Sequence, residues 1–417
     1  MNQPVLWLLL AIFGELVALL FLLFGILTLG FTLLSGAPLT GMETVTTASL
    51  MTLGLTFGIA LAIQLLRSWK GKEEIPFPSI RIWMLSLAWI VVVGAGTAAN
   101  LVPLLQIALL PPLHILAMSL PAFIMLAVVR QQMRGVKFSW RESIASLTGG
   151  GPLATGASLV IELILLLIVG LIAGVFLLQT PDLLEQIREL AQTLQETGQE
   201  LPMGEVAEIL LRPSIVISTI ALTSIPVPII EEFLKTLVIG IAARWTQPRP
   251  PRAFLWGVAS GAGFALVENL LNGGMMGVEG WTTLALSRFA ATTLHCATGG
   301  IMGWAWGQFW TQKRRLRLPL AYLLAVIVHG VWNALATGAS LLGLRVIVNE
   351  GDGIGTLLTS GAVLLLAGTL FTLTIFFLVL LPVSGRWLAS REAGEAEAST
   401  EKIEEGSDGS RLSEEPA

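Results

Sequence analysis

Ten long apolar runs, separated by short polar segments, follow one another along the chain. Each run has roughly the 20 residues that an α-helix needs to cross the hydrocarbon core of a bilayer, or more. The pattern therefore predicts an all-α, polytopic transmembrane helical bundle of about ten spans. The predicted spans are Val5–Leu34, Ala48–Leu66, Ile82–Ala99, Leu101–Val129, Thr155–Leu178, Ile215–Ala243, Phe254–Met275, Trp281–Trp310, Leu318–Leu344 and Gly355–Val383.

Prolines interrupt two of these predicted spans. Pro111 and Pro112 lie within the fourth span, and Pro226 and Pro228 lie within the sixth. Because proline lacks the N–H group that the interior of a helix requires, we expect a kink or a break at both places. Irregular backbone at membrane depth is tolerated only where protein or a water-filled cavity surrounds it. The break in the sixth span therefore marks a candidate internal site.

The composition agrees with a membrane protein and excludes other classes. Hydrophobic residues make up 54% of the 417 residues and charged residues only 12%, which is about half of the charged share of a soluble domain. The single cysteine, Cys296, cannot form a disulfide within the chain. A net charge of −4 gives no basic footprint for a nucleic acid. The expected surroundings are the lipid bilayer, and no nucleic acid is expected as a partner.

Basic residues in the connections predict the orientation. Connections after even-numbered spans are rich in Lys and Arg, whereas those after odd-numbered spans hold only Arg188, Arg212 and Arg345. The positive-inside rule then places both termini in the cytoplasm. The many glycines and the absence of disulfides fit a multi-pass protein of the plasma (inner) membrane of a bacterium.

Three regions differ in their patterns. Residues 1–150 hold four spans and carry no motif to which we assign a role, whereas residues 151–384 hold the other six spans and the motifs described below. Residues 179–214 have a helical pattern with a polar face and are predicted to lie outside the membrane, as a cap or as a solvated connector. Residues 385–417 are acidic and small, and we expect a disordered cytoplasmic tail there.

Ionisable side chains within the predicted spans are functional candidates, because a charge at the centre of a bilayer costs roughly 2.5–3.5 kcal/mol. Seven of the ten lie between residues 231 and 329, on four consecutive spans. The ten are Glu15, His114, Glu162, Glu231, Glu232, Lys235, Glu268, Arg288, His295 and His329.

Helical spacing brings these candidates together in small groups. Glu231 and Glu232 follow Pro228, and we expect them in the first turn of a new half-helix, where unpaired N–H groups favour carboxylates. Lys235 lies one turn beyond Glu231, so an i,i+4 ion pair is expected, either in a hydrolytic site or as a lock between helices. Other pairs share one helix face: Phe264 with Glu268, Arg288 with His295, and His329 with Asn333.

The order Glu-Glu-x-x-Lys, Phe-x-x-x-Glu, a single His and then His-x-x-x-Asn resembles the PrsW family of intramembrane proteases, which is related to the CAAX prenyl proteases and bacteriocin-processing enzymes. The resemblance extends from about Pro213 to Leu344. It implies an intramembrane endopeptidase that acts on membrane-associated proteins, such as a single-pass regulatory protein. The matching residues are Glu231, Glu232, Lys235, Phe264, Glu268, His295, His329 and Asn333.

Peptide hydrolysis needs an activated water, a proton donor for the leaving amine and groups that stabilise the oxyanion. Glu231 is the candidate base, with Glu232 in support. His329 and Asn333 are candidate donors to the oxyanion, and His295 is the candidate that orients the water or protonates the leaving amine. Glu268 is a further catalytic candidate, and Lys235, Phe264 and Arg288 are supporting ones.

The same side chains also suit a zinc ion, which in catalytic sites takes three protein ligands and a water. His295 and His329 with either Glu231 or Glu268 would suffice, although the motif His-Glu-x-x-His is absent. A zinc enzyme and an enzyme without a cofactor both remain open.

Two other classes of protein compete with a protease. A proton-coupled transporter also uses intramembrane carboxylates, histidines and broken helices, but the first four spans hold no counterpart of the motif in the sixth. A non-catalytic membrane scaffold is the third class. Cleavage of a membrane protein, as against movement of a solute, separates these classes.

The predicted orientation can be tested by labelling single cysteines from one side of the membrane in a Cys296→Ala background. A cysteine within residues 179–214 should react from outside, and one within residues 313–317 only from the cytoplasm. Labelling of both positions from the same side would contradict the predicted number of spans.

Overall fold

The computed structural model describes residues 3–35, 40–177, 179–197, 203–272, 280–348 and 353–411. Within these residues the chain is helical and has no strand, and one isolated β-bridge joins Pro76 to Ser139. The helices are α1 (Gln3–Ser35), α2 (Gly41–Trp69), α3 (Ile82–Ala99), α4 (Pro103–Ala108), α5 (Leu110–Gln132), α6 (Trp140–Thr148), the π-turn η1 (Gly149–Leu153), α7 (Ala154–Leu177), α8 (Pro181–Thr197), α9 (Met203–Leu210), α10 (Pro213–Ser224), α11 (Pro226–Thr246), α12 (Pro250–Asn272), α13 (Trp281–Thr311), α14 (Arg317–Val348) and α15 (Gly353–Arg411).

Nine helical stretches among the described residues are long and apolar enough to cross a membrane. The prediction of an all-α polytopic bundle is therefore confirmed. The eighth predicted span, Trp281–Trp310, also forms one helix, α13, but it is not among the nine. It has 31 residues, and its polar and glycine-rich faces are buried against neighbouring helices rather than exposed.

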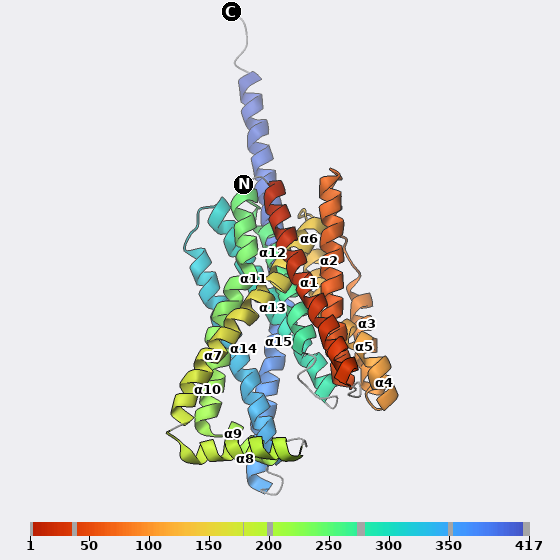
Figure 1. Ribbon diagram of the computed structural model, residues 1–417. Coiled ribbons are helices and arrows are strands. Elements are labelled where there is room, and N and C mark those ends of the chain that lie inside the picture. Colours follow the sequence, from red (N-terminus) through yellow and green to blue (C-terminus); the bar gives the residue numbers. More distant parts are fainter. Residues whose placement is uncertain are drawn as a thin grey trace, which may run out of the picture.

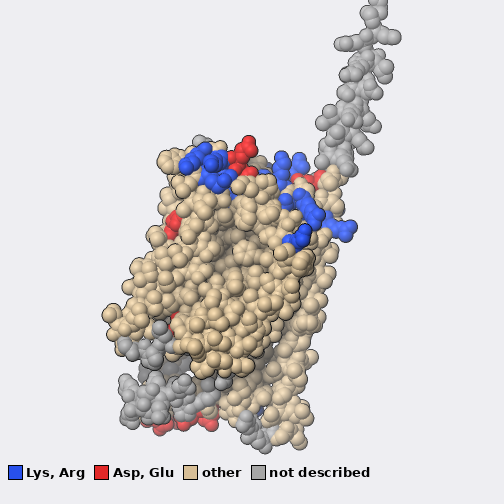
Figure 2. Space-filling model, turned by 90° about the vertical axis from the view of Figure 1, so that its right-hand side faces the viewer, with Lys and Arg blue, Asp and Glu red and all other residues tan. Residues whose placement is uncertain are grey.

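The two ends of the described chain lie at the same end of the bundle (Figure 1). On the face drawn in Figure 2, Lys and Arg gather at this end, while the surface below it is almost free of charge. We call it the basic end. Apolar side chains such as Phe24, Leu167 and Phe371 are exposed on the long helices, as expected of surfaces that face lipid. Helix α8 crosses the opposite end of the molecule.

Both proline pairs interrupt the backbone, as the sequence predicts. The fourth span divides at Leu109 into α4 and α5, and the sixth divides at Ile225 into α10 and α11. Pro226 starts α11, because proline fits the first turn of a helix, where its missing N–H group has no partner to lose.

A short helix followed by a π-turn, α6 and η1, is absent from the predicted elements. Ser139 caps α6 and forms a capping box with Glu142. The glycines of η1 bring its backbone against α12, where a methyl group at Gly150 would overlap Ser260. Periodicity of apolar residues does not reveal this element, because glycines carry no such pattern.

Glycines also set the distance between α12 and α13 at the centre of the bundle. A methyl group at Gly257 would overlap the carbonyl group of Gly299, and one at Gly261 would overlap that of His295. Small residues let two helix backbones approach in this way. As a result, Phe264 and Glu268 of α12 lie directly beside His295.

The segment after residue 384 differs from the expected disordered tail, because α15 continues through it to Arg411 (Figure 1). The segment is rich in Ala and Glu, which favour helix even where no packing supports it. The low apolar content that suggested disorder therefore does not prevent local helix formation.

Candidate active site

The acidic motif lies on the second turn of α11 rather than on its first. The helix starts at Pro226, so Glu231 and Glu232 are its sixth and seventh residues, and the first turn holds no acidic residue. The expectation that unpaired N–H groups at the helix start hold these carboxylates is therefore wrong. Both side chains are buried, Glu232 completely, and their partners are side chains of α11, α13 and α14 rather than N–H groups at the helix start.

The sequence predicts an i,i+4 ion pair between Glu231 and Lys235, and this prediction is wrong. Lys235 pairs instead with Glu232, three residues before it. Lys235 Nζ donates to Glu232 Oε1 over 2.7 Å, and both side chains are fully buried. Both spacings are possible on a helix. Lys235 pairs with Glu232 because both side chains point toward α13 and α14, where their other polar partners lie.

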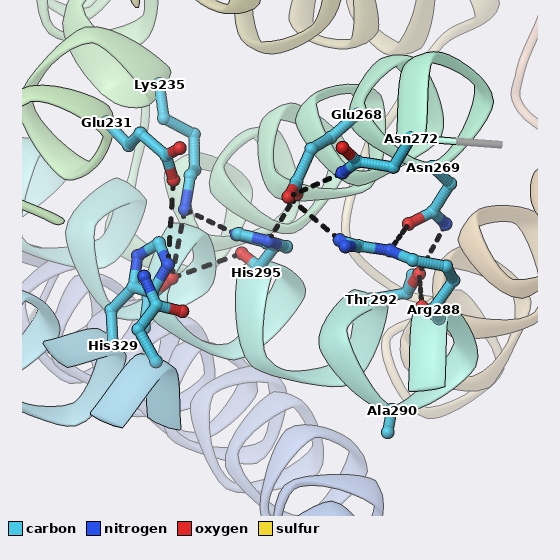
Figure 3. Close-up of polar contacts among 12 residues, drawn as sticks. Glu231, Lys235, Glu268, Asn269, Asn272, Arg288, Ala290, Thr292, His295 and His329 are labelled. Atoms are coloured by element: carbon cyan, nitrogen blue, oxygen red, sulfur yellow. Dashed lines mark hydrogen bonds and ion pairs between the residues drawn. The ribbon is translucent and has the colours of Figure 1, made fainter. Parts of the chain in front are cut away.

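Glu232 Oε1 accepts hydrogen bonds from three side chains. Besides Lys235, it receives a hydrogen bond from Thr298 Oγ1 (3.2 Å) and lies 2.8 Å from His329 Nδ1. A carboxylate at this position accepts, so the proton of the His329 ring resides on Nδ1. His329 Nε2 then presents its lone pair to Glu231, whose Oε2 is 3.6 Å away (Figure 3).

His295 lies between a cation and a carboxylate. Its Nδ1 is 3.0 Å from Lys235 Nζ, and its Nε2 is 2.9 Å from Glu268 Oε2. Because an ammonium group only donates, Nδ1 accepts and the ring proton resides on Nε2, facing Glu268. The Phe264 ring supports this arrangement: its centroid is 5.2 Å from the His295 ring and 4.9 Å from Lys235 Nζ.

A second ion pair holds Glu268 in place. Arg288 Nη2 lies 2.9 Å from Glu268 Oε1, and Arg288 Nε donates to Asn269 Oδ1 over 2.8 Å. Asn269 is fully buried and donates in turn to Met118 of α5 and to Thr292. Arg288 is thus fixed on both sides, as Figure 3 shows, and fixes the carboxylate that faces His295.

Asn333 lies apart from the carboxylates, at the break in the sixth span. Its Nδ2 donates to the backbone oxygen of Thr223, over 2.9 Å, and Gly330 lets α14 come close to Ser224. The amide has two N–H groups, so one remains for another acceptor. That Asn333 acts together with His329, one turn before it on α14, stays a prediction.

The structure thus brings together Glu231, Glu232, Lys235, Phe264, Glu268, Arg288, His295 and His329, from four helices. Sequence reasoning missed Thr298 and Asn269, because uncharged polar residues are common in packed helices. It noted Glu162 as an intramembrane acid without linking it to the site. Glu162 of α7 lies near enough to Glu231 and Glu268 for their charges to interact.

Three of these side chains are close enough together to suggest a metal site. Glu231, His295 and His329 each bring one possible ligand atom to within 4.8 Å of the others. Glu231 and His329 present free lone pairs. His295 does not fit, because one ring nitrogen faces the Lys235 ammonium and the other faces Glu268 through its proton. A metal ligand must offer a lone pair, so His295 would have to leave Lys235 first.

Buried carboxylates, an ammonium group and two imidazoles converge inside a bundle of transmembrane helices, and such buried ionisable groups mark a functional site in a membrane protein. Residues 162–385 match the family described as PrsW family intramembrane metalloprotease. This match covers more than half of the chain, which therefore belongs to the PrsW family and is a membrane protease. No curated protein and no solved structure matches the chain.

Removal of Lys235 should destabilise the protein, because Glu232 would remain buried without its cation. Lys235→Met should lower the free energy of unfolding by about 3–5 kcal/mol, as should Glu232→Gln, which leaves Lys235 unpaired. The double variant should lose much less than the sum of the two. The measurement is a double-mutant cycle of unfolding in mixed micelles.

Lys70→Met, a change of the same kind at an exposed position, is the matched control and should stay within about 0.5 kcal/mol of the wild type. Additive single effects would contradict the pairing.

Proposed function

We propose that this protein hydrolyses peptide bonds of membrane-associated protein substrates with water that Glu231 activates. The observation that carries the proposal is the contrast between the two neighbouring glutamates. Glu232 is neutralised by Lys235 and held by His329 and Thr298. Among the described residues Glu231 forms no ion pair with a Lys or Arg side chain, and its Oε2 lies 3.6 Å from His329 Nε2. It is therefore the carboxylate left free to accept a proton.

Glu231 Oε2 and His329 Nε2 lie 3.6 Å apart, and both atoms accept hydrogen bonds. A hydrogen-bond donor beside the two atoms would satisfy both. A water molecule supplies such a donor. In the proposed step, one water proton passes to Glu231 while the oxygen attacks the scissile carbonyl carbon. The proton then passes to the leaving nitrogen as the C–N bond breaks, and Glu231 is ionised again.

The groups around Glu231 have separate proposed roles. His329 and the second N–H group of Asn333 donate to the developing oxyanion, which needs donors fixed in advance. His329 donates through Nε2 once the oxygen has attacked, when the proton taken from water is shared between Glu231 and this nitrogen. His295 orients the water, or passes the proton from Glu231 on to the leaving amine, with its ring fixed by Lys235 and Glu268. Arg288 and Phe264 are positioning residues, because they act on Glu268 and His295.

The family is described as a metalloprotease, and Glu231, His295 and His329 are the residues that a zinc ion would use. The surroundings of His295 argue against its binding zinc, because one ring nitrogen faces the Lys235 ammonium group and the other faces the Glu268 carboxylate. We therefore derive the reaction from the side chains alone. Zinc bound by these residues is the second candidate.

The proposed substrate is a membrane-associated protein, such as a single-pass regulatory protein, in the plasma membrane of a bacterium. Family membership and the convergence of Glu231 with two histidines favour hydrolysis over proton-coupled transport or a scaffold. Purified protein in liposomes should cleave a single-span reporter and should move no solute in the same vesicles.

Glu231→Gln should lower turnover of such a reporter by about 10²–10⁴-fold, because the amide cannot accept a proton from water. Glu231→Ala should do the same. The matched control is Glu15→Gln, which removes an intramembrane carboxylate from α1 and should keep normal turnover. More than about a tenth of wild-type turnover in folded Glu231→Gln would rule out a general base at this position.

Metal removal tests the second candidate separately. If Glu231 acts alone on water, chelation should leave turnover unchanged, and active protein should contain far less than one zinc per chain. Loss of turnover with the chelator, restored by added zinc, would mean that His295 leaves Lys235 and binds the metal. Turnover and zinc content should be measured on the same preparation.

A further inference from the structure

A cavity of about 700 Å³ lies at the basic end, far along the helices from the candidate active site. It is formed by the start of α12, the end of α13, the start of α14 and the extension of α15. One carboxylate, Glu392, is among its lining residues. Four arginines and two tryptophans surround it: Arg249, Arg314, Arg317, Arg391, Trp304 and Trp387.

Most of this positive charge has no carboxylate partner. Arg249 pairs with Glu392 over 3.3 Å, but its side chain is 70% exposed, and such exposed pairs are weak. The ion pairs found among the described residues include neither Arg314 nor Arg391, and Arg317 donates instead to Gln308, over 2.6 Å. The cavity therefore concentrates guanidinium groups whose donors are available to an anion.

The tryptophans hold two of these arginines in place. The Arg391 guanidinium lies 4.4 Å from the centroid of the Trp387 ring, and that of Arg317 lies 5.3 Å from the Trp304 ring. Cation–π contacts of this kind fix the direction of a long side chain. Both arginines are thus oriented before an anion arrives.

The cavity lies at the level where the helices leave the apolar part of the molecule. Residue Pro250 starts α12, Thr311 ends α13 and Arg317 starts α14, and Figure 2 shows the basic side chains above a long uncharged surface. Tryptophan is typical of this depth, beside the lipid headgroups. An anion reaching the cavity sideways from the bilayer is therefore a lipid phosphate.

We propose that this cavity binds the phosphate headgroup of an anionic phospholipid from the surrounding bilayer. Guanidinium groups bind phosphate through paired N–H donors, and basic pockets between transmembrane helices recognise lipid headgroups. The rings of Trp304 and Trp387, with Leu388, form the apolar side of the cavity, against which the glycerol and the first acyl carbons pack.

The test uses the full chain purified in detergent micelles. Added phosphatidylglycerol should raise the unfolding temperature and remain bound in native mass spectra, whereas phosphatidylcholine with the same acyl chains should do neither. The variant Arg314→Gln/Arg391→Gln should weaken phosphatidylglycerol binding on the order of thirtyfold, since each arginine near a lipid surface contributes about fivefold.

The matched control is Arg134→Gln/Lys137→Gln, which removes two exposed basic residues that do not line the cavity. It should bind phosphatidylglycerol like the wild type. Equal loss in the control would mean that general surface charge attracts the lipid, and full binding by the cavity variant would also overturn the proposal. An equal rise in unfolding temperature with inorganic phosphate would show that the cavity binds a soluble anion and not a lipid.

Discussion

The ion pair between Lys235 and Glu232 is the constraint on which the arrangement of the site depends. Both groups are completely buried, so each requires the other, because an uncompensated charge inside the bundle would cost several kcal/mol. Once they are paired, Glu232 fixes the proton of His329 on Nδ1 and Lys235 fixes that of His295 on Nε2. One ion pair thus assigns opposite tautomers to two rings whose centroids are 5.1 Å apart. Among the described residues, it also leaves Glu231 without an ion pair to a Lys or Arg side chain.

Close packing of the helix backbones then fixes the positions of the other side chains of the site. The glycine contacts between α12 and α13 place Glu268 against His295, and the glycines of η1 hold α12 from its other side. Arg288, Asn269 and Met118 then connect Glu268 to α5. The first spans, for which the sequence offers no role, therefore support the site through α5.

The length of the apolar runs suffices to predict the helices, and proline chemistry suffices to predict the breaks at Leu109 and Ile225. The cost of charge in a membrane is likewise enough to select the side chains that converge. The sequence could not decide between Glu231 and Glu232 as the partner of Lys235, because both spacings are allowed on a single helix. That choice comes from Thr298 and His329, on other helices.

Other features leave weak signals in a sequence. Asn269 and Thr292 form hydrogen bonds of a kind that is common in packed helices, and the glycines of η1 carry no periodic pattern. The helical extension of α15 was missed for a different reason: low apolar content argues against a folded core, but not against an isolated helix.

The polarity of α13 has a consequence for biogenesis. This helix is not apolar enough to be counted among those that cross a membrane by themselves, and an arginine such as Arg288 opposes entry into lipid by roughly 2.5–3.5 kcal/mol. Its glycine face and its charged side chains are accommodated only against α12, α11 and α14. We therefore expect α13 to leave the insertion machinery together with α12 as a helical hairpin, with Glu268 and Arg288 already paired. Assembly of the site and insertion of the chain would then be one event.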